Sequence, residues 1–165
     1  MKVTTKAYGP VEVDERQRVR FPGGLFGFEG IEDYILIDAD RQPFYWLQSL
    51  EAEHIAFVVI NPFLFRPDYE LDIDDERLRD IGITSADAAL IFAIVTIPPS
   101  GPMTANLQGP LIINRDTRTG KQEILTDPRW KTKHNVMEEL KRSGGGPDNA
   151  GGTSLGGTDP GEKDR

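Results

Sequence analysis

Residues 72–76 hold the densest group of possible metal ligands in the chain, with four carboxylates in five positions. Such runs can begin a Ca²⁺ loop, but an EF-hand needs Gly at its sixth position and Glu at its twelfth. Counted from Asp72, those positions hold Arg77 and Ile83. The run therefore fails as a calcium loop and is typical of a helix start with a solvated acidic face.

Other metal and phosphate chemistry finds equally little support. The chain has no Cys, and its two histidines, His54 and His134, lie far apart in sequence, whereas zinc needs three or four ligands held together. Gly24, Gly27 and Gly30 match neither phosphate-binding glycine motif. We therefore expect no metal and no cofactor, and read the glycines as a compact turn closed by its own aromatic residues.

Catalytic motifs are also missing from the sequence. There is no G-x-S-x-G nucleophile elbow, and carboxylate pairs such as Glu51 and Glu53 arise by chance among 27 acidic residues. The residues do not demand an enzyme and favour a protein-binding function. A small-ligand-binding β-barrel or a carboxylate-based enzyme remains the alternative.

Charge and hydropathy narrow the partner class. The chain has 165 residues and a net charge of −8. Without a basic patch, direct nucleic-acid binding is disfavoured, because phosphate contacts supply most of that affinity. No apolar run approaches the ~18 residues of a membrane span, and no secretory signal is visible. We expect a cytoplasmic protein, monomeric alone, whose partner is a protein.

The composition changes sharply after Arg142. Residues 143–165 are rich in Gly and contain one large apolar residue, Leu155. Such a segment cannot bury enough surface to offset the entropy of ordering it. The sequence predicts one domain over residues 1–142 and a disordered tail over 143–165.

Hydrophobic alternation predicts a mainly-β domain, an antiparallel barrel or roll with one or two short helices. Asp74 is expected to cap a helix over 75–81, and Asn135 one over 136–141 with Glu138 completing a capping box. Strands are expected at 11–13 and 19–21 (a hairpin), 34–37, 44–47, 55–60, 90–97, 111–113 and 122–125, the last two joined by a hairpin with Gly120 left-handed.

Several motifs of this sequence resemble those of one known protein family and follow one another in the same order. Residues 21–29 (FPGGLFGFE) and 44–50 (FYWLQSL) resemble its two opening signatures, and 104–114 (TANLQGPLIIN) a later one. The family is FliW, the bacterial flagellar assembly factors. The resemblance implies a non-enzymatic, barrel-like cytoplasmic protein that binds flagellin and the RNA-binding carbon storage regulator CsrA. It further implies partner switching: flagellin captures the protein, and flagellin export frees it to sequester CsrA and relieve repression of flagellin translation.

The candidate residues fall into three groups. Acids of 68–80 could face a basic partner, although the same run could simply be a solvated surface. Amides and a hydroxyl beside the apolar strands could contact a partner or fix the fold by buried hydrogen bonds, and we leave both open. The acids are Asp68, Glu70, Asp72, Asp74, Asp75 and Glu76; the polar group is Gln48, Ser49, Asn106, Asn114 and Gln122; the structural signature is Phe21, Pro22, Gly23, Gly24, Gly27, Phe28 and Pro62.

Removing residues 143–165 should leave the melting temperature and partner affinity nearly unchanged, because the segment offers almost no apolar anchor. Differential scanning calorimetry of the full and shortened chains measures this. A fall of several degrees in the shortened chain would show that the segment docks on the domain.

Overall fold

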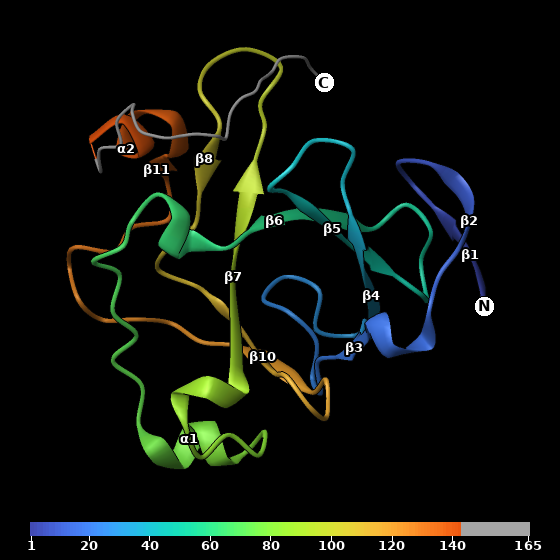
Figure 1. Cartoon of the computed structure of the whole chain (residues 1–165), viewed down its shortest axis with the longest axis horizontal. Helices are drawn as coiled ribbons and strands as arrows, with labels where there is room; N and C mark the ends of the chain where they lie inside the picture. The colour runs from blue at the N-terminus through green and yellow to red at the C-terminus, as the bar shows by residue number, and fades with distance from the viewer. Residues whose placement is uncertain (143–165) are drawn as a thin grey trace.

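A path of seven antiparallel strands in the order β10-β9-β7-β6-β5-β4-β3 forms most of the molecule. The computed structural model describes residues 1–142 (Figure 1). Off this path, β8 pairs with β7 and β11 pairs with β8, while β1 and β2 form a separate two-stranded sheet. The strands are β1 Lys2–Thr5, β2 Gly9–Glu12, β3 Arg18–Arg20, β4 Asp33–Asp38, β5 Tyr45–Ser49, β6 Ala56–Ile60, β7 Ala89–Thr96, β8 Thr104–Ala105, β9 Leu111–Asn114, β10 Gly120–Gln122 and β11 His134–Asn135.

The long strand β7 joins the two halves of this path. Residues 89–92 pair with β9, whereas residues 93–95 pair with β6. An apolar run of this kind is expected of a strand buried on both faces, and Phe92, Ala93 and Val95 are buried. The prediction of a central strand here is confirmed.

The strand path curls until its two ends meet. Arg20 of β3 forms one isolated parallel bridge with Thr119, and its N–H donates to the Arg118 carbonyl at 2.9 Å. Within residues 1–142 this contact is one bridge pair and not a ladder, so the sheet is a roll that approaches a barrel. The expected mainly-β, barrel-like fold is confirmed.

The expected hairpin over residues 11–21 is wrong. β2 pairs back onto β1, and a 3-10 turn, η1 (Glu15–Gln17), leads into β3, which pairs with β4. The reason is local capping: the Asp14 side chain accepts the Arg16 N–H at 2.8 Å, and Gln17 accepts the Asp14 N–H at 2.9 Å. These bonds close a helical turn instead of a hairpin turn.

The predicted hairpin between the strands at 111–113 and 122–125 is confirmed, but its turn and second strand lie earlier in the chain than expected. β9 and β10 pair, but β10 ends at Gln122 and the left-handed residue is Arg118 at φ 60°. Gly120 lies in β10, where a Cβ would press on Phe21 and on the Ile112 carbonyl. The glycine is therefore required by close packing and not by the turn.

Both short helices are present. α1 spans Asp75–Arg79 and ends before the expected residue 81; Asp74 is its N-cap residue, without a side-chain cap bond. α2 spans Val136–Arg142, and Asn135 caps it by accepting the Glu138 N–H at 3.0 Å. Two further 3-10 turns are η2 (Pro62–Leu64) and η3 (Ala86–Ala88).

The loop after β3 carries the glycine-rich signature. Phe21 is fully buried, Pro22 is exposed, and Phe28 is half-buried with its ring edge-on to Phe57 at 5.0 Å. Gly24 has φ +79°, and a Cβ there would collide with the backbone carbonyls of Phe28 and Glu29. The loop therefore closes on itself only because residue 24 has no side chain.

Gly24→Ala should destabilise the fold by about 3 kcal/mol, because a left-handed residue acquires a Cβ that collides with backbone atoms. Urea unfolding of the variant measures the change. Gly23→Ala is the matched control: it has φ +84° but open space around the new Cβ, and should lose only about 1 kcal/mol. Equal losses in the two variants would contradict the packing argument.

Candidate protein-binding surface

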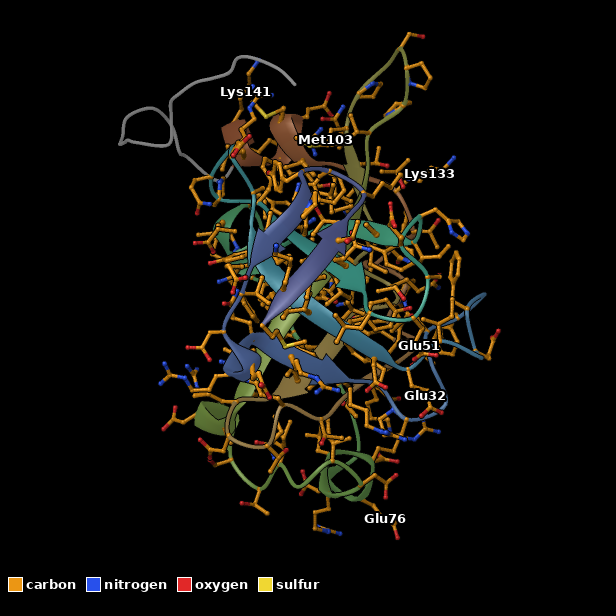
Figure 2. All side chains as sticks on the ribbon, turned by 90° about the vertical axis from the view of Figure 1, so that its right-hand side faces the viewer. Glu32, Glu51, Glu76, Met103, Lys133 and Lys141 are labelled. Carbon is orange, nitrogen blue, oxygen red and sulfur yellow. The ribbon has the colours of Figure 1, made fainter. Side chains whose placement is uncertain are left out.

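The acidic segment, residues 68–80, runs from η2 down one side of the molecule to α1 (Figure 1). Asp72, Asp74, Asp75 and Glu76 are exposed. In the part of the chain that the structure describes, no basic side chain forms an ion pair with any of these four. Figure 2 shows Glu76 at the opposite end of the molecule from Lys141. The structure therefore gathers four carboxylates without a direct ion pair on one exposed stretch, with Arg77 near enough to Asp74 to interact electrostatically.

The two acids at the start of this segment are held differently. Asp68 pairs with Arg66 at 2.8 Å, and Glu70 pairs with Arg129 at 2.8 Å. Hydrogen bonding to the Arg66 guanidinium lowers the pKa of the Asp68 carboxyl to about 2. Asp68 is therefore charged at neutral pH and fixed toward the body of the protein.

Both arginines stack on one buried tryptophan. The guanidinium carbons of Arg66 and Arg129 lie 4.8 and 4.7 Å from the ring centre of Trp130, which is 1% exposed. Tyr69 packs edge-on to the indole at 4.8 Å and donates its hydroxyl to the Leu107 carbonyl at 2.6 Å. We call this arrangement of Arg66, Tyr69, Arg129 and Trp130 the tryptophan clasp. The Arg66 and Arg129 side chains stay 23% and 47% exposed, so water weakens both cation–π contacts relative to fully buried ones.

Helix α2 joins the clasp through one carboxylate. Glu139 accepts from Arg66 at 3.0 Å with one oxygen and pairs with His134 Nδ1 at 2.7 Å with the other. His134 Nε2 accepts the Lys131 N–H at 2.8 Å, so the ring proton lies on Nδ1 and is donated to Glu139. The acidic segment, the loop before β11 and α2 are thereby held together.

A second anchor fixes the far end of the acidic segment. Glu123, which is buried, accepts from Arg77 of α1 at 2.8 Å and pairs with Lys121 at 2.9 Å. Burial alone would raise the pKa of the Glu123 carboxyl, but the bonds to Lys121 and Arg77 lower it below its usual value. Residues 71–76 are therefore held between two anchored ends.

Two exposed apolar residues adjoin this surface, and the sequence reasoning missed them. Phe63 and Leu64 of η2 are 38% and 48% exposed, and the Phe63 ring lies 5.7 Å from that of Tyr69. The available signal was Asn61-Pro62, a helix start; Asn61 caps the turn by accepting the Phe63 N–H at 2.9 Å. Pro62 itself is buried at the first position of η2.

Three of the polar candidates are buried and form hydrogen bonds with backbone groups. The Gln48 amide accepts the Lys6 N–H and donates to the Glu53 carbonyl. Ser49 Oγ accepts two N–H groups of the following turn. Asn114 accepts two N–H groups of the β9–β10 turn and donates to the Ile81 carbonyl. These contacts favour the structural alternative for Gln48, Ser49 and Asn114; their part in partner binding stays a prediction.

The other two polar candidates are partly exposed. Asn106 accepts the N–H groups of Gln108 and Gly109, while Gln122 accepts the Phe26 N–H and donates to the Gly109 carbonyl. Asn106 thus holds the turn at residues 106–109, and Gln122 joins that turn to the glycine-rich loop. Of the five polar candidates, Asn114 is tied to the end of the acidic segment, because its amide donates to the Ile81 carbonyl just beyond residue 80.

Residues 1–142 contain no group of three His, Asp or Glu side chains arranged to hold a metal ion. Among the same residues, every helix is too short and too polar to span a bilayer. The surface described here offers charge and apolar contact, which are the elements of a protein interface.

Comparison with known proteins identifies the family. The model of the FliW protein family matches residues 2–136. The chain belongs to the FliW family. It is 51% identical over 145 residues to the flagellar assembly factor FliW of Treponema denticola, covering 87% of this chain and 99% of that protein. For the same factor of Treponema pallidum the identity is 46%, over 85% of this chain and 94% of that protein.

A solved FliW structure has the same fold. A crystal structure of the flagellar assembly factor FliW superimposes with a TM-score of 0.75 at 39% identity, covering 82% of this chain and 96% of that one. The resemblance seen in the sequence motifs is thus confirmed as FliW membership. The disordered tail predicted over residues 143–165 lies outside the residues that the structure describes.

Glu139→Gln should destabilise the FliW fold by about 2 kcal/mol, because it weakens the charge-assisted bonds to Arg66 and His134 in a nearly buried position. Urea unfolding followed by tryptophan fluorescence measures the loss. Glu138→Gln is the matched control on the same helix; Glu138 is exposed and, within residues 1–142, forms an ion pair only with Arg142, so its loss should be about 0.5 kcal/mol or less. Equal losses would show that the clasp does not depend on Glu139.

Proposed function

We propose that this FliW-family chain is a non-enzymatic partner switch that binds flagellin and a CsrA-type translational regulator. Flagellin occupies it until export; the freed protein then sequesters the regulator and relieves repression of flagellin translation. The chain acts in the cytoplasm and is monomeric before it meets a partner. Family membership supports this, since the relatives are flagellar assembly factors.

One observation carries the proposal for the regulator: four exposed acids, Asp72, Asp74, Asp75 and Glu76, have no ion pair within residues 1–142 and are held between two anchored ends. Proteins that bind RNA do so with basic surfaces. An acidic surface approaches such a partner quickly and disfavours RNA beside it. Because both ends are fixed, little ordering entropy is lost when the partner binds.

The apolar residues beside the acids make the surface more than a charge patch. Phe63 packs against Tyr69, the residue between Asp68 and Glu70, and Leu64 is exposed directly after Phe63 in the chain. Interfaces combine an apolar centre with a polar rim, and the centre supplies most of the affinity. In this proposal the acids set the rate and selectivity of encounter, whereas Phe63 and Leu64 slow dissociation.

Replacing Asp72, Asp74 and Asp75 together by Lys should weaken binding to the CsrA-type partner by about tenfold or more and flatten its salt dependence, because the attraction becomes repulsion. Titration calorimetry at low and moderate salt measures both quantities. Unchanged affinity at low salt would contradict the assignment of the surface.

The matched control reverses three exposed acids elsewhere, Glu15, Asp38 and Asp40, and so changes the net charge equally. This control should lose about threefold or less, through long-range charge alone. If it loses as much as the first variant, net charge and not the acidic segment governs binding.

A further inference from the structure

The strand β1 has one edge that no other strand covers. Met1 and Val13 exchange two backbone hydrogen bonds, at 2.8 and 2.9 Å, in the register that continues through the β1–β2 hairpin. Hydrogen-bonded and non-hydrogen-bonded pairs alternate in an antiparallel ladder. Lys2 and Thr4 are therefore in non-hydrogen-bonded pairs, and their N–H and C=O groups point away from β2.

The two outer edges of this hairpin are unequal. On β2 the outward positions are Pro10 and Glu12, and a proline and a charge are the usual means of blocking an exposed edge. On β1, Lys2 and Thr4 each keep a backbone N–H and a C=O that point away from β2. Within residues 1–142 no strand pairs with these groups. One edge is protected against strand addition and the other is left able to accept a strand.

The open edge of β1 borders a groove. The groove has a volume of ≈ 560 Å³ and lies between Lys2–Thr4 and the turn carrying Leu50, Glu51 and Glu53, with Arg18 and Asp33 also in its lining. Figure 2 shows the β1–β2 hairpin on the face toward the viewer, with Glu51 to one side of it. One strand residue fills on the order of 150 Å³, from its rise and the spacing of strands and layers, so the groove admits roughly three to four residues of one strand.

We propose that this groove binds an extended peptide segment of another protein, which adds to β1 as an extra antiparallel strand. Four backbone groups on Lys2 and Thr4 supply its hydrogen bonds, the mode known as β-augmentation. Charge does not select the peptide, because Met1 with its α-ammonium group, Lys2 and Arg18 line the groove together with the acids Asp33, Glu51 and Glu53. Backbone hydrogen bonds therefore hold it. The β1–β2 hairpin that borders the groove lies across the molecule from the acidic segment (Figure 1), and the inference does not depend on the proposed function.

A second copy of this chain is the less suitable occupant. A second β1 would bring its own β2 and domain into the groove, and the turn at residues 50–53 forms a wall opposite the edge. A single extended segment fits between that wall and β1.

The test uses a blocked peptide, acetyl-Thr-Lys-Val-Lys-Val-Thr-amide, and the full chain. We expect saturable binding by calorimetry, and slower hydrogen exchange by NMR at the Lys2 and Thr4 amides but not at Val3, whose N–H already faces β2. The same peptide with every backbone nitrogen methylated should bind about tenfold or more weakly, because its donors are lost. Absence of binding at millimolar peptide, equal binding of the methylated peptide, or protection elsewhere would overturn the proposal.

Variants of Thr4 test the edge from the protein side. Thr4→Pro removes an outward N–H without removing a bond to β2, and should weaken the peptide by about tenfold, whereas Thr4→Val keeps the N–H and should bind like the parent chain. If sedimentation shows a dimer that the peptide fails to dissociate, a second copy is the occupant and the proposal is wrong. Because the methylated peptide acts on the unaltered chain, the test holds even if Thr4→Pro disturbs the hairpin.

Discussion

The buried indole of Trp130, held between the guanidinium groups of Arg66 and Arg129, is the contact on which the proposed function depends. Two cations on one aromatic ring would repel each other if their charge were not compensated. Each arginine is therefore paired with carboxylates from two places in the chain: Asp68 and Glu139 for Arg66, Glu70 and Asp127 for Arg129. The stack thus unites the start of the acidic segment, the loop before β11 and helix α2. The acids that look alike in sequence are in this way divided into those that hold the segment and those that remain available to a partner.

Placing the exposed acids close together costs electrostatic free energy, which the fold offsets. Four exposed acids in five positions repel one another, by an amount that salt screening reduces. The segment keeps its place because both its ends are fixed, at the tryptophan clasp and at the ion pairs of buried Glu123 with Arg77 and Lys121. A partner that brings positive charge relieves this repulsion and meets a surface that is already ordered. Preorganisation and charge complementarity therefore act together on the same residues.

Local signals in the sequence were sufficient for several elements. The apolar run of β7 and the Asn135 cap of α2 follow from periodicity and capping chemistry, and the family motifs identified the fold. The hairpin over residues 11–21 failed because the Asp14 and Gln17 side chains close a 3-10 turn, which a reading of hydrophobic alternation does not weigh. The clasp was out of reach, since Arg66, Trp130 and Glu139 are far apart in sequence and only the fold brings them together. Gln48 and Asn114 show the same limit: the residue type permits a buried bond or a surface contact, and their burial, which favours the bond, is known only from the fold.

The central claim is that one protein binds flagellin and a CsrA-type regulator in alternation. The most direct measurement is titration calorimetry of the purified chain with each partner from the same organism, alone and then with the other partner present at saturation. The account predicts tight binding to each partner alone, and loss of CsrA binding when flagellin is present. Simultaneous binding of both partners with unchanged affinities, or binding of neither, would contradict it.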